Sequence, residues 1–243
     1  MMRNDLRIYD DVAGQWWSDE IRWVRTLKNL VPARLGWMDR QFDWNDRSVL
    51  DLGCAGGFMA EALDDRGARV SGIDPAPAAI AAASRHAEAH GREIDYRTGV
   101  GEALPYADGQ FDAVVCVDVL EHVEDLGEVI TQVHRVLRPG GCFLFDTINR
   151  NPLARLATIT IAEDILRLLP RGTHDPALFI RPAELREHLQ HAGLIPGPFT
   201  GLGPRGINRR GDLTFGRLPM TGILYMGRAD KPAQSPPGEH EKG

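Results

Sequence analysis

Cysteine is scarce in this 243-residue chain, which contains only Cys54, Cys116 and Cys142. All three fall in or beside segments that we predict to be buried strands. So few cysteines, in such places, favour reduced thiols over disulfides and a cytosolic protein. The N-terminus carries acidic residues early and lacks the apolar segment of a signal peptide, which supports the same cytoplasmic location.

Long apolar runs and an excess of positive charge are also absent. No stretch of about eighteen apolar residues occurs, so no membrane-spanning helix is expected. With 28 basic and 34 acidic residues the net charge is −6, which argues against non-specific nucleic-acid binding. We expect a single globular domain over residues 1–229. A disordered tail is expected over 230–243, where Pro, Lys, Glu and Gly dominate.

Short apolar strands and helices alternate regularly along the chain. Strands are expected at 49–52, 69–74, 94–97, 111–116, 142–146 and 222–226, with helices beginning at 58, 78 and 126 between the first five. This alternation predicts an α/β fold, in which a Rossmann-like, doubly wound and mostly parallel sheet is flanked by helices.

The N-terminal segment, residues 9–45, is expected to be helical. A helix is predicted from Ile21 to Leu35, broken by Pro32. Two interpretations of the adjacent Trp16 and Trp17 stay open: packing of a helix on the core, or a lid over a binding site. Arg34 taken alone is interpreted as a solvated surface charge.

A turn of small residues follows the first strand, with the sequence Gly53-Cys54-Ala55-Gly56-Gly57. Such a strand, glycine turn and helix bring bare backbone to a ligand at the carboxyl edge of the sheet. The dinucleotide fingerprint G-x-G-x-x-G is incomplete, because Ala55 and Phe58 occupy two of its glycine positions. The turn is therefore poorly suited to a pyrophosphate.

Asp74 ends the second strand, about twenty residues after the turn, where an acid can accept hydrogen bonds from ribose hydroxyls. Ribose recognition without a phosphate cradle points to a nucleoside, and S-adenosylmethionine is the common cofactor of that kind. The alternative is a structural turn, with Asp74 capping the next helix. The correct spacing of the two motifs favours the cofactor.

Asp118, Glu121 and His122 directly follow the fourth strand, at the same edge of the sheet. If a helix begins here, the spacings of three and four residues place them on one face. They could then bind a divalent cation or act as a general base without metal. The alternative is ordinary helix N-terminal chemistry, with Asp118 as the cap.

An apolar helical insertion is expected after the fifth strand, over residues 150–181. Its leucines and isoleucines, concentrated in 152–170, have a loose helical spacing and few balancing charges. It is interpreted as a satellite core, as a lid for an apolar substrate, or as a surface that touches a membrane.

The chain resembles class I S-adenosylmethionine methyltransferases, and specifically the ubiquinone-biosynthesis O-methyltransferase family. The resemblance extends from about residue 9 to residue 226. The pieces that carry it are Trp16-Trp17, 32–36, 49–54, Gly72-Ile73-Asp74, 120–123, Asn149-Arg150-Asn151, 165–167, Gly172-Thr173-His174-Asp175 and 200–202. It implies a seven-stranded sheet, and it gives Arg34 a role at the cofactor that its residue type alone did not suggest.

The resemblance implies a cofactor site formed by Arg34, Asp51, Gly53, Cys54, Ala55, Gly56, Asp74, Pro75, Gly101, Glu102, Ala103 and Val117. It assigns Asp118, Glu121 and His122 to a divalent metal such as Mg²⁺, and the insertion to lipid contact. Three departures stand out. Ala55 replaces a glycine, which is tolerated if its φ is negative; Asp118 is shorter than the usual Glu; and segment 203–218 differs from its counterpart.

The expected reaction is transfer of a methyl group to a phenol or catechol hydroxyl of a polyprenylated ubiquinone precursor of the 3-demethylubiquinol type. A metal bound at Asp118, Glu121 and His122 would lower the pKa of the phenol by direct coordination. Without metal, His122 or His174 would act as general base. The protein would then work in the cytoplasm, as a peripheral protein on the inner face of the membrane. Two alternatives remain: a methyltransferase for a soluble small molecule, and a non-catalytic cofactor-binding scaffold.

Overall fold

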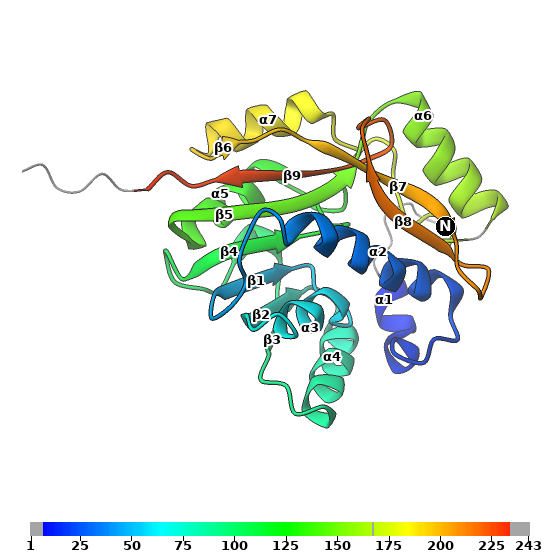
Figure 1. Cartoon of the computed structure of the whole chain (residues 1–243), viewed down its shortest axis with the longest axis horizontal. Coiled ribbons are helices and arrows are strands. Elements are labelled where there is room, and N and C mark those ends of the chain that lie inside the picture. Colours follow the sequence, from blue (N-terminus) through cyan, green and yellow to red (C-terminus); the bar gives the residue numbers. More distant parts are fainter. Residues whose placement is uncertain (1–6, 167, 234–243) are drawn as a thin grey trace, which may run out of the picture.

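A computed structural model describes residues 7–166 and 168–233 of the chain. Its centre is one nine-stranded sheet in the order β3-β2-β1-β4-β5-β9-β7-β8, with β6 paired to β9 (Figure 1). The strands are β1 Ser48–Leu52, β2 Arg69–Asp74, β3 Asp95–Thr98, β4 Phe111–Cys116, β5 Leu137–Ile148, β6 Ile195–Pro196, β7 Thr200–Ile207, β8 Leu213–Leu218 and β9 Leu224–Asp230.

The first five strands are parallel, and the last four pair antiparallel. The chain leaves β1 for β2 on one side and later returns to β4 on the other, so the strand order reverses at β1. Ligands bind at such a switch point, beyond the carboxyl ends of the strands. This topology confirms the predicted Rossmann-like, doubly wound fold.

Helices cover both faces of the sheet (Figure 1). They are α1 Arg7–Asp11, η1 Ala13–Gln15, α2 Arg22–Met38, α3 Phe58–Asp64, α4 Pro77–Ala89, η2 Gly101–Ala103, α5 Leu126–Val136, α6 Pro152–Arg155, η3 Leu156–Ile165 and α7 Pro182–His191. Strand β4 shows why two cores form: Val114 packs with α5 on one face, and its neighbour Val115 packs with α2 and α3 on the other. Successive strand residues point to opposite faces, so a strand buried on both sides is continuously apolar.

The sheet has nine strands instead of the seven expected. The difference arises mainly from residues 200–218, whose Gly and Arg content gave no clear strand pattern. Their backbones nevertheless pair as the antiparallel hairpin β7–β8, with a register shift between Pro204 and Gly206. Such a shift removes the regular alternation on which strand prediction depends.

Two boundaries also differ from the sequence prediction. Pro32 does not break α2, which continues to Met38 because its apolar side chains pack on the sheet on both sides of the proline. Strand β9 extends to Asp230, which pairs with Cys142 and so does not belong to a disordered tail. The rest of the predicted tail from residue 234 onward lies outside the described residues.

Cys54, Cys116 and Cys142 are buried free thiols, as predicted. In the described part of the chain, no helix is both long and apolar enough to cross a membrane.

Candidate active site

The turn after β1 requires left-handed backbone. Gly53 has φ +79° and Gly57 has φ +92°. A Cβ on Gly53 would lie 2.1 Å from a methyl carbon of Val119, so only glycine fits there. Ala55 has φ +43°, so the condition under which alanine would be tolerated without strain, a negative φ, is not met. This backbone is held by a hydrogen bond from the Ala55 amide to Asp74 Oδ2, 2.9 Å long.

Asp74 links the turn to the second strand. Oδ2 accepts from Ala55, and Oδ1 accepts the amide of Ala76 at 2.9 Å. Burial raises the pKa of Asp74 to about 6, although these two amides oppose the shift. Asp74 does not cap the next helix, whose N-cap is Ala76; it stabilises the turn and also lines the cavity above it, and its contact with a ribose stays a prediction.

That cavity lies along the carboxyl ends of β1, β2 and β4. Ten of the twelve predicted cofactor residues line it: Arg34, Asp51, Gly53, Cys54, Ala55, Asp74, Pro75, Gly101, Glu102 and Val117. Ala103 and Gly56 do not. Space beside Gly56 is filled by the indole of Trp16, and its carbonyl accepts a hydrogen bond from Trp17 Nε1 at 3.0 Å.

Asp51 makes the cavity suitable for a cationic nucleoside. It is fully buried, and its carboxylate accepts no side-chain hydrogen bond within residues 7–166 and 168–233. Burial and the nearby charge of Asp74 raise its pKa to about 7, against the opposing effect of the Ala60 backbone amide. A buried carboxylate with so few donors is costly, so a ligand with an ammonium or sulfonium group would stabilise it. S-adenosylmethionine carries both groups and a ribose for Asp74, so these residues fit it.

The N-terminal segment contributes part of the cavity wall. Arg7, Tyr9 and Trp16 line it, which the sequence did not indicate beyond the two tryptophans. Trp16 stacks on Phe58 with ring centroids 5.2 Å apart, and Trp17 stacks on His86 at 3.6 Å. Both rings therefore pack on the domain, and Trp16 also lines the cavity, while a lid over the cofactor stays a prediction.

Arg34 is buried and not a surface charge. Its guanidinium contacts Asp118 and Asp146, with N–O distances of 2.5 Å to each. Burial raises the pKa of Asp146 to about 6, against the opposing effect of Arg34. Asp146 was not among the site residues predicted from the sequence. The sequence did contain one indication of it, because Asp146 is an acid at the end of a predicted apolar strand.

Asp118 does not share a helix face with Glu121 and His122, as had been expected. The segment after β4 forms turns, and α5 begins only at Leu126 with Asp125 as its cap. Asp118 has φ +54°, its amide donates to Asp146 at 2.8 Å, and its carboxylate pairs with Arg34. The ion pair with Arg34 thus takes the carboxylate that had been predicted to bind a metal.

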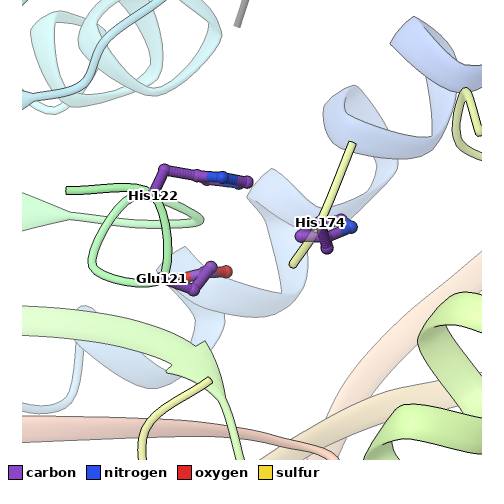
Figure 2. A group of neighbouring side chains, drawn as sticks. All are labelled: Glu121, His122 and His174. Atoms are coloured by element: carbon purple, nitrogen blue, oxygen red, sulfur yellow. The ribbon is translucent and has the colours of Figure 1, made fainter. Parts of the chain in front are cut away.

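His174 takes the third place in the cluster instead. Potential ligand atoms of Glu121, His122 and His174 lie within 4.8 Å of one another, and all three residues are buried. Figure 2 shows the His122 ring directed toward His174, with Glu121 beside them. The two imidazoles are stacked with centroids 5.1 Å apart. The cluster thus joins the loop after β4 to the C-terminal part of the insertion.

The cluster has strongly shifted pKa values. Burial, with a smaller effect of Asp118, raises the pKa of Glu121 to about 8. Oε2 of Glu121 accepts from the Thr147 hydroxyl at 2.7 Å, and Oε1 has no hydrogen-bond partner in the described part of the chain. Burial lowers the pKa of His122 to about 3, and His174 adds to this. At neutral pH the imidazole of His122 is therefore uncharged.

The donor set does not fit Mg²⁺. Magnesium binds oxygen ligands in an octahedron, whereas this cluster offers two imidazole nitrogens and one carboxylate. Asp118, which would have supplied a second carboxylate, is paired with Arg34. Imidazole donors suit zinc and other first-row transition ions better. The chemistry below is therefore derived without magnesium.

Comparison with known proteins agrees with this fold and cavity. A family model described as a methyltransferase domain matches residues 50–145. A solved S-adenosylmethionine-dependent methyltransferase from Thermotoga maritima has a TM-score of 0.65 at 16% identity, covering 93% of this chain and 98% of the other, which shows the likeness of the fold. The fold and the cavity define a class I S-adenosylmethionine-dependent methyltransferase.

Sequence relatives identify the family within this class of methyltransferases. Ubiquinone biosynthesis O-methyltransferases from Pseudomonas aeruginosa and Azotobacter vinelandii are each 43% identical over 199 residues, covering 82% of this chain and 85% of the relative. The chain belongs to the ubiquinone biosynthesis O-methyltransferase family. This confirms the predicted class and its cofactor, S-adenosylmethionine.

Proposed function

We propose that this methyltransferase methylates a phenol or catechol hydroxyl of a polyprenylated ubiquinone precursor, of the 3-demethylubiquinol type. The names of the relatives support the pathway. The observation that carries the reaction type is the position of the Glu121–His122–His174 cluster. Of the three members of the cluster, His122 lines the cofactor cavity and the other two do not. The cluster therefore lies at the edge of that cavity. Buried proton acceptors at this junction are what O-methylation of a phenol requires.

The bound cofactor supplies a methyl group on a positively charged sulfur. Transfer to a phenolate neutralises charge, so a site closed to water favours it. Trp16 and Phe58, which lie over the glycine turn, exclude solvent on the cofactor side. Arg34 holds the loop that carries Asp118 against β5, and so fixes the backbone that leads to Glu121 and His122.

The proton of the hydroxyl must pass to one member of the cluster. His122 is a weak base, because burial lowers its pKa to about 3. We assign the proton to His174, whose imidazole faces the other two residues (Figure 2). Glu121 Oε1, which has no hydrogen-bond partner in the described part of the chain, then accepts a hydrogen bond from the second hydroxyl of a catechol. A well-positioned general base contributes about 10²–10⁴-fold to such a step.

The assay that tests this function measures methyl transfer from S-adenosylmethionine to catechols with and without a short prenyl tail. His174→Asn should lower kcat by about 10²-fold or more and leave cofactor binding intact. His191→Asn, on an exposed histidine of α7, is the matched control and should stay within about twofold of wild type. Full turnover by His174→Asn would remove this role. Equal rates on tailed and tail-free acceptors would favour the soluble-substrate alternative.

We also propose that the insertion contacts a membrane surface or the prenyl tail. Its outer face exposes Leu153, Leu156, Ile161, Ile165 and Leu166, each at least 40% accessible. Apolar side chains gathered on one short element are typical of a membrane or lipid contact. This location suits an acceptor whose tail resides in a bilayer.

A further inference from the structure

Glu163 is a buried carboxylate on the inner side of the insertion. It lies in η3, a π-helix, and only 1% of it is exposed. Two backbone N–H groups donate to it, the Gly172 amide to Oε2 at 2.8 Å and the His174 amide to Oε1 at 3.1 Å, and ring Nδ1 of His174 lies 2.9 Å from Oε1. These bonds offset the cost of burying the charge, and they join the insertion directly to an active-site histidine.

The bond to the ring decides which nitrogen of His174 carries the proton. A carboxylate oxygen that accepts from Nδ1 places the hydrogen there, so Nε2 keeps its lone pair. The role proposed for His174 requires a ring nitrogen that can accept a proton, and the Nδ1–H tautomer provides it at Nε2. A carboxylate also stabilises the imidazolium that forms when the proton arrives.

We propose that Glu163 is a positioning residue of the active site, which holds His174 as the Nδ1–H tautomer and thereby makes catalysis depend on the insertion helix. The proposal rests on the proposed function of His174. A purely structural role would need only the two backbone amides, which already tie the turn before His174 to η3. The additional bond to Nδ1 is the feature that such a role leaves unexplained.

The geometry of η3 supports this link. Ile161 and Ile165 lie two residues on either side of Glu163 and are 40% and 66% exposed, so the helix shows apolar side chains outward and one carboxylate inward. The Leu166 amide bonds to the Ile161 carbonyl at 2.8 Å, a five-residue spacing. π-Helices are rare and occur frequently at functional sites.

The first experiment compares Glu163→Gln with Asp164→Asn. The control removes the neighbouring acid, which is 46% exposed and, among the residues that the structure describes, pairs with Arg171 at the surface. Glu163→Gln should lower kcat by about 10–100-fold, with KM for S-adenosylmethionine within about twofold, because Glu163 does not line the cofactor cavity. Asp164→Asn should stay within about twofold in both. Equal kcat in the two variants overturns the proposal.

The second experiment adds Glu163→Gln to His174→Asn. If Glu163 acts through His174, the double variant should be no slower than His174→Asn within about threefold, since the residue through which it acts is gone. A further tenfold loss overturns the proposal and makes Glu163 a general stability residue. If His174→Asn slows turnover but Glu163→Gln does not, only this inference fails. If His174→Asn is fully active, the proposed function of His174 fails first.

A third measurement uses no variant at Glu163, so it tests the proposal even if Glu163→Gln fails to fold. In ¹⁵N-histidine-labelled wild-type protein, two-bond correlation spectra report which ring nitrogen is protonated, and His174→Asn assigns the signals. Nδ1 of His174 should appear as the protonated nitrogen and Nε2 as the unprotonated one. The opposite pattern overturns the proposal.

Discussion

Arg34 in α2 and Asp146 in β5 form a buried ion pair with 2.5 Å between Nε and Oδ2, although 112 residues separate them in the chain. Removing one partner of a buried pair leaves the other charge uncompensated, which costs about 3–5 kcal/mol. Arg34→Met should lower the free energy of unfolding by that amount in urea denaturation.

The control for this prediction is an exposed ion pair. Arg69 and Asp46 have side chains that are 59% and 80% accessible, and such pairs contribute less than about 1 kcal/mol. Arg69→Met should therefore leave the urea midpoint nearly unchanged. A similar loss in both variants would show that the burial of Arg34 has no special importance.

Ala55→Gly should stabilise the protein. Ala55 has φ +43°, a region that costs a residue with a Cβ about 1–2 kcal/mol and costs glycine little. We expect the free energy of unfolding to rise by about 1 kcal/mol, with cofactor binding retained. Ala81→Gly, at an exposed position inside α4, should instead lower it by about 0.5–1 kcal/mol. Destabilisation by Ala55→Gly would contradict the strain argument.

The affinity for S-adenosylhomocysteine should depend on pH through Asp74. Its pKa is raised to about 6 by burial, so the carboxylate of the empty site gains its charge as the pH rises through 6. Ribose hydroxyls donate more strongly to the charged form, so binding should tighten by up to about tenfold between pH 5 and 7. Calorimetry across this range measures the effect. Asp51, whose pKa is raised to about 7, also gains charge in this range, so Asp74→Asn should bind weakly and lose only the part of the pH dependence centred near pH 6. An unchanged profile would assign the whole dependence to Asp51.

Vesicle flotation tests the outer face of the insertion. Replacing Ile161, Ile165 and Leu166 with serine should reduce binding to anionic vesicles by at least about tenfold, since burying each side chain contributes about 1 kcal/mol or more. Ile195→Ser is the control, because Ile195 is 60% exposed on β6 at another part of the surface. Equal flotation of the triple variant and wild type would exclude this face as the membrane contact.

The cofactor half of the site was predictable from sequence because it depends on local patterns. The glycine turn ending at Gly57 and the acid Asp74 each follow a strand, and parallel strands bring their carboxyl ends to one edge. Ten of twelve residues expected at the cofactor line the cavity for that reason. Gly56 does not, because Trp16, forty residues earlier, fills the space beside it, and no local pattern encodes that contact.

The acceptor half depends on contacts between distant segments, and there sequence reasoning failed in one respect. A helical spacing was assumed for Asp118, Glu121 and His122, but the chain turns at Asp118 with φ +54° and gives its carboxylate to Arg34. His174, fifty-two residues beyond His122, completes the cluster in place of Asp118, and its ring is held by a hydrogen bond with Glu163. Neither the positive φ of Asp118 nor its replacement by His174 in the cluster produces a periodic pattern in the sequence.

The long span between Arg34 and its carboxylates also bears on how the protein is made. A ribosome adds about 5–20 residues per second, so Asp146 follows Arg34 by roughly 6–22 s. In the first part of that interval Arg34 has neither carboxylate, and until Asp146 is made it has only the less buried Asp118, which opposes the docking of α2 on the nascent strands. The cofactor cavity, which Arg34 lines, therefore closes only after β5 has left the exit tunnel, and a chain stalled before residue 146 should not bind S-adenosylmethionine.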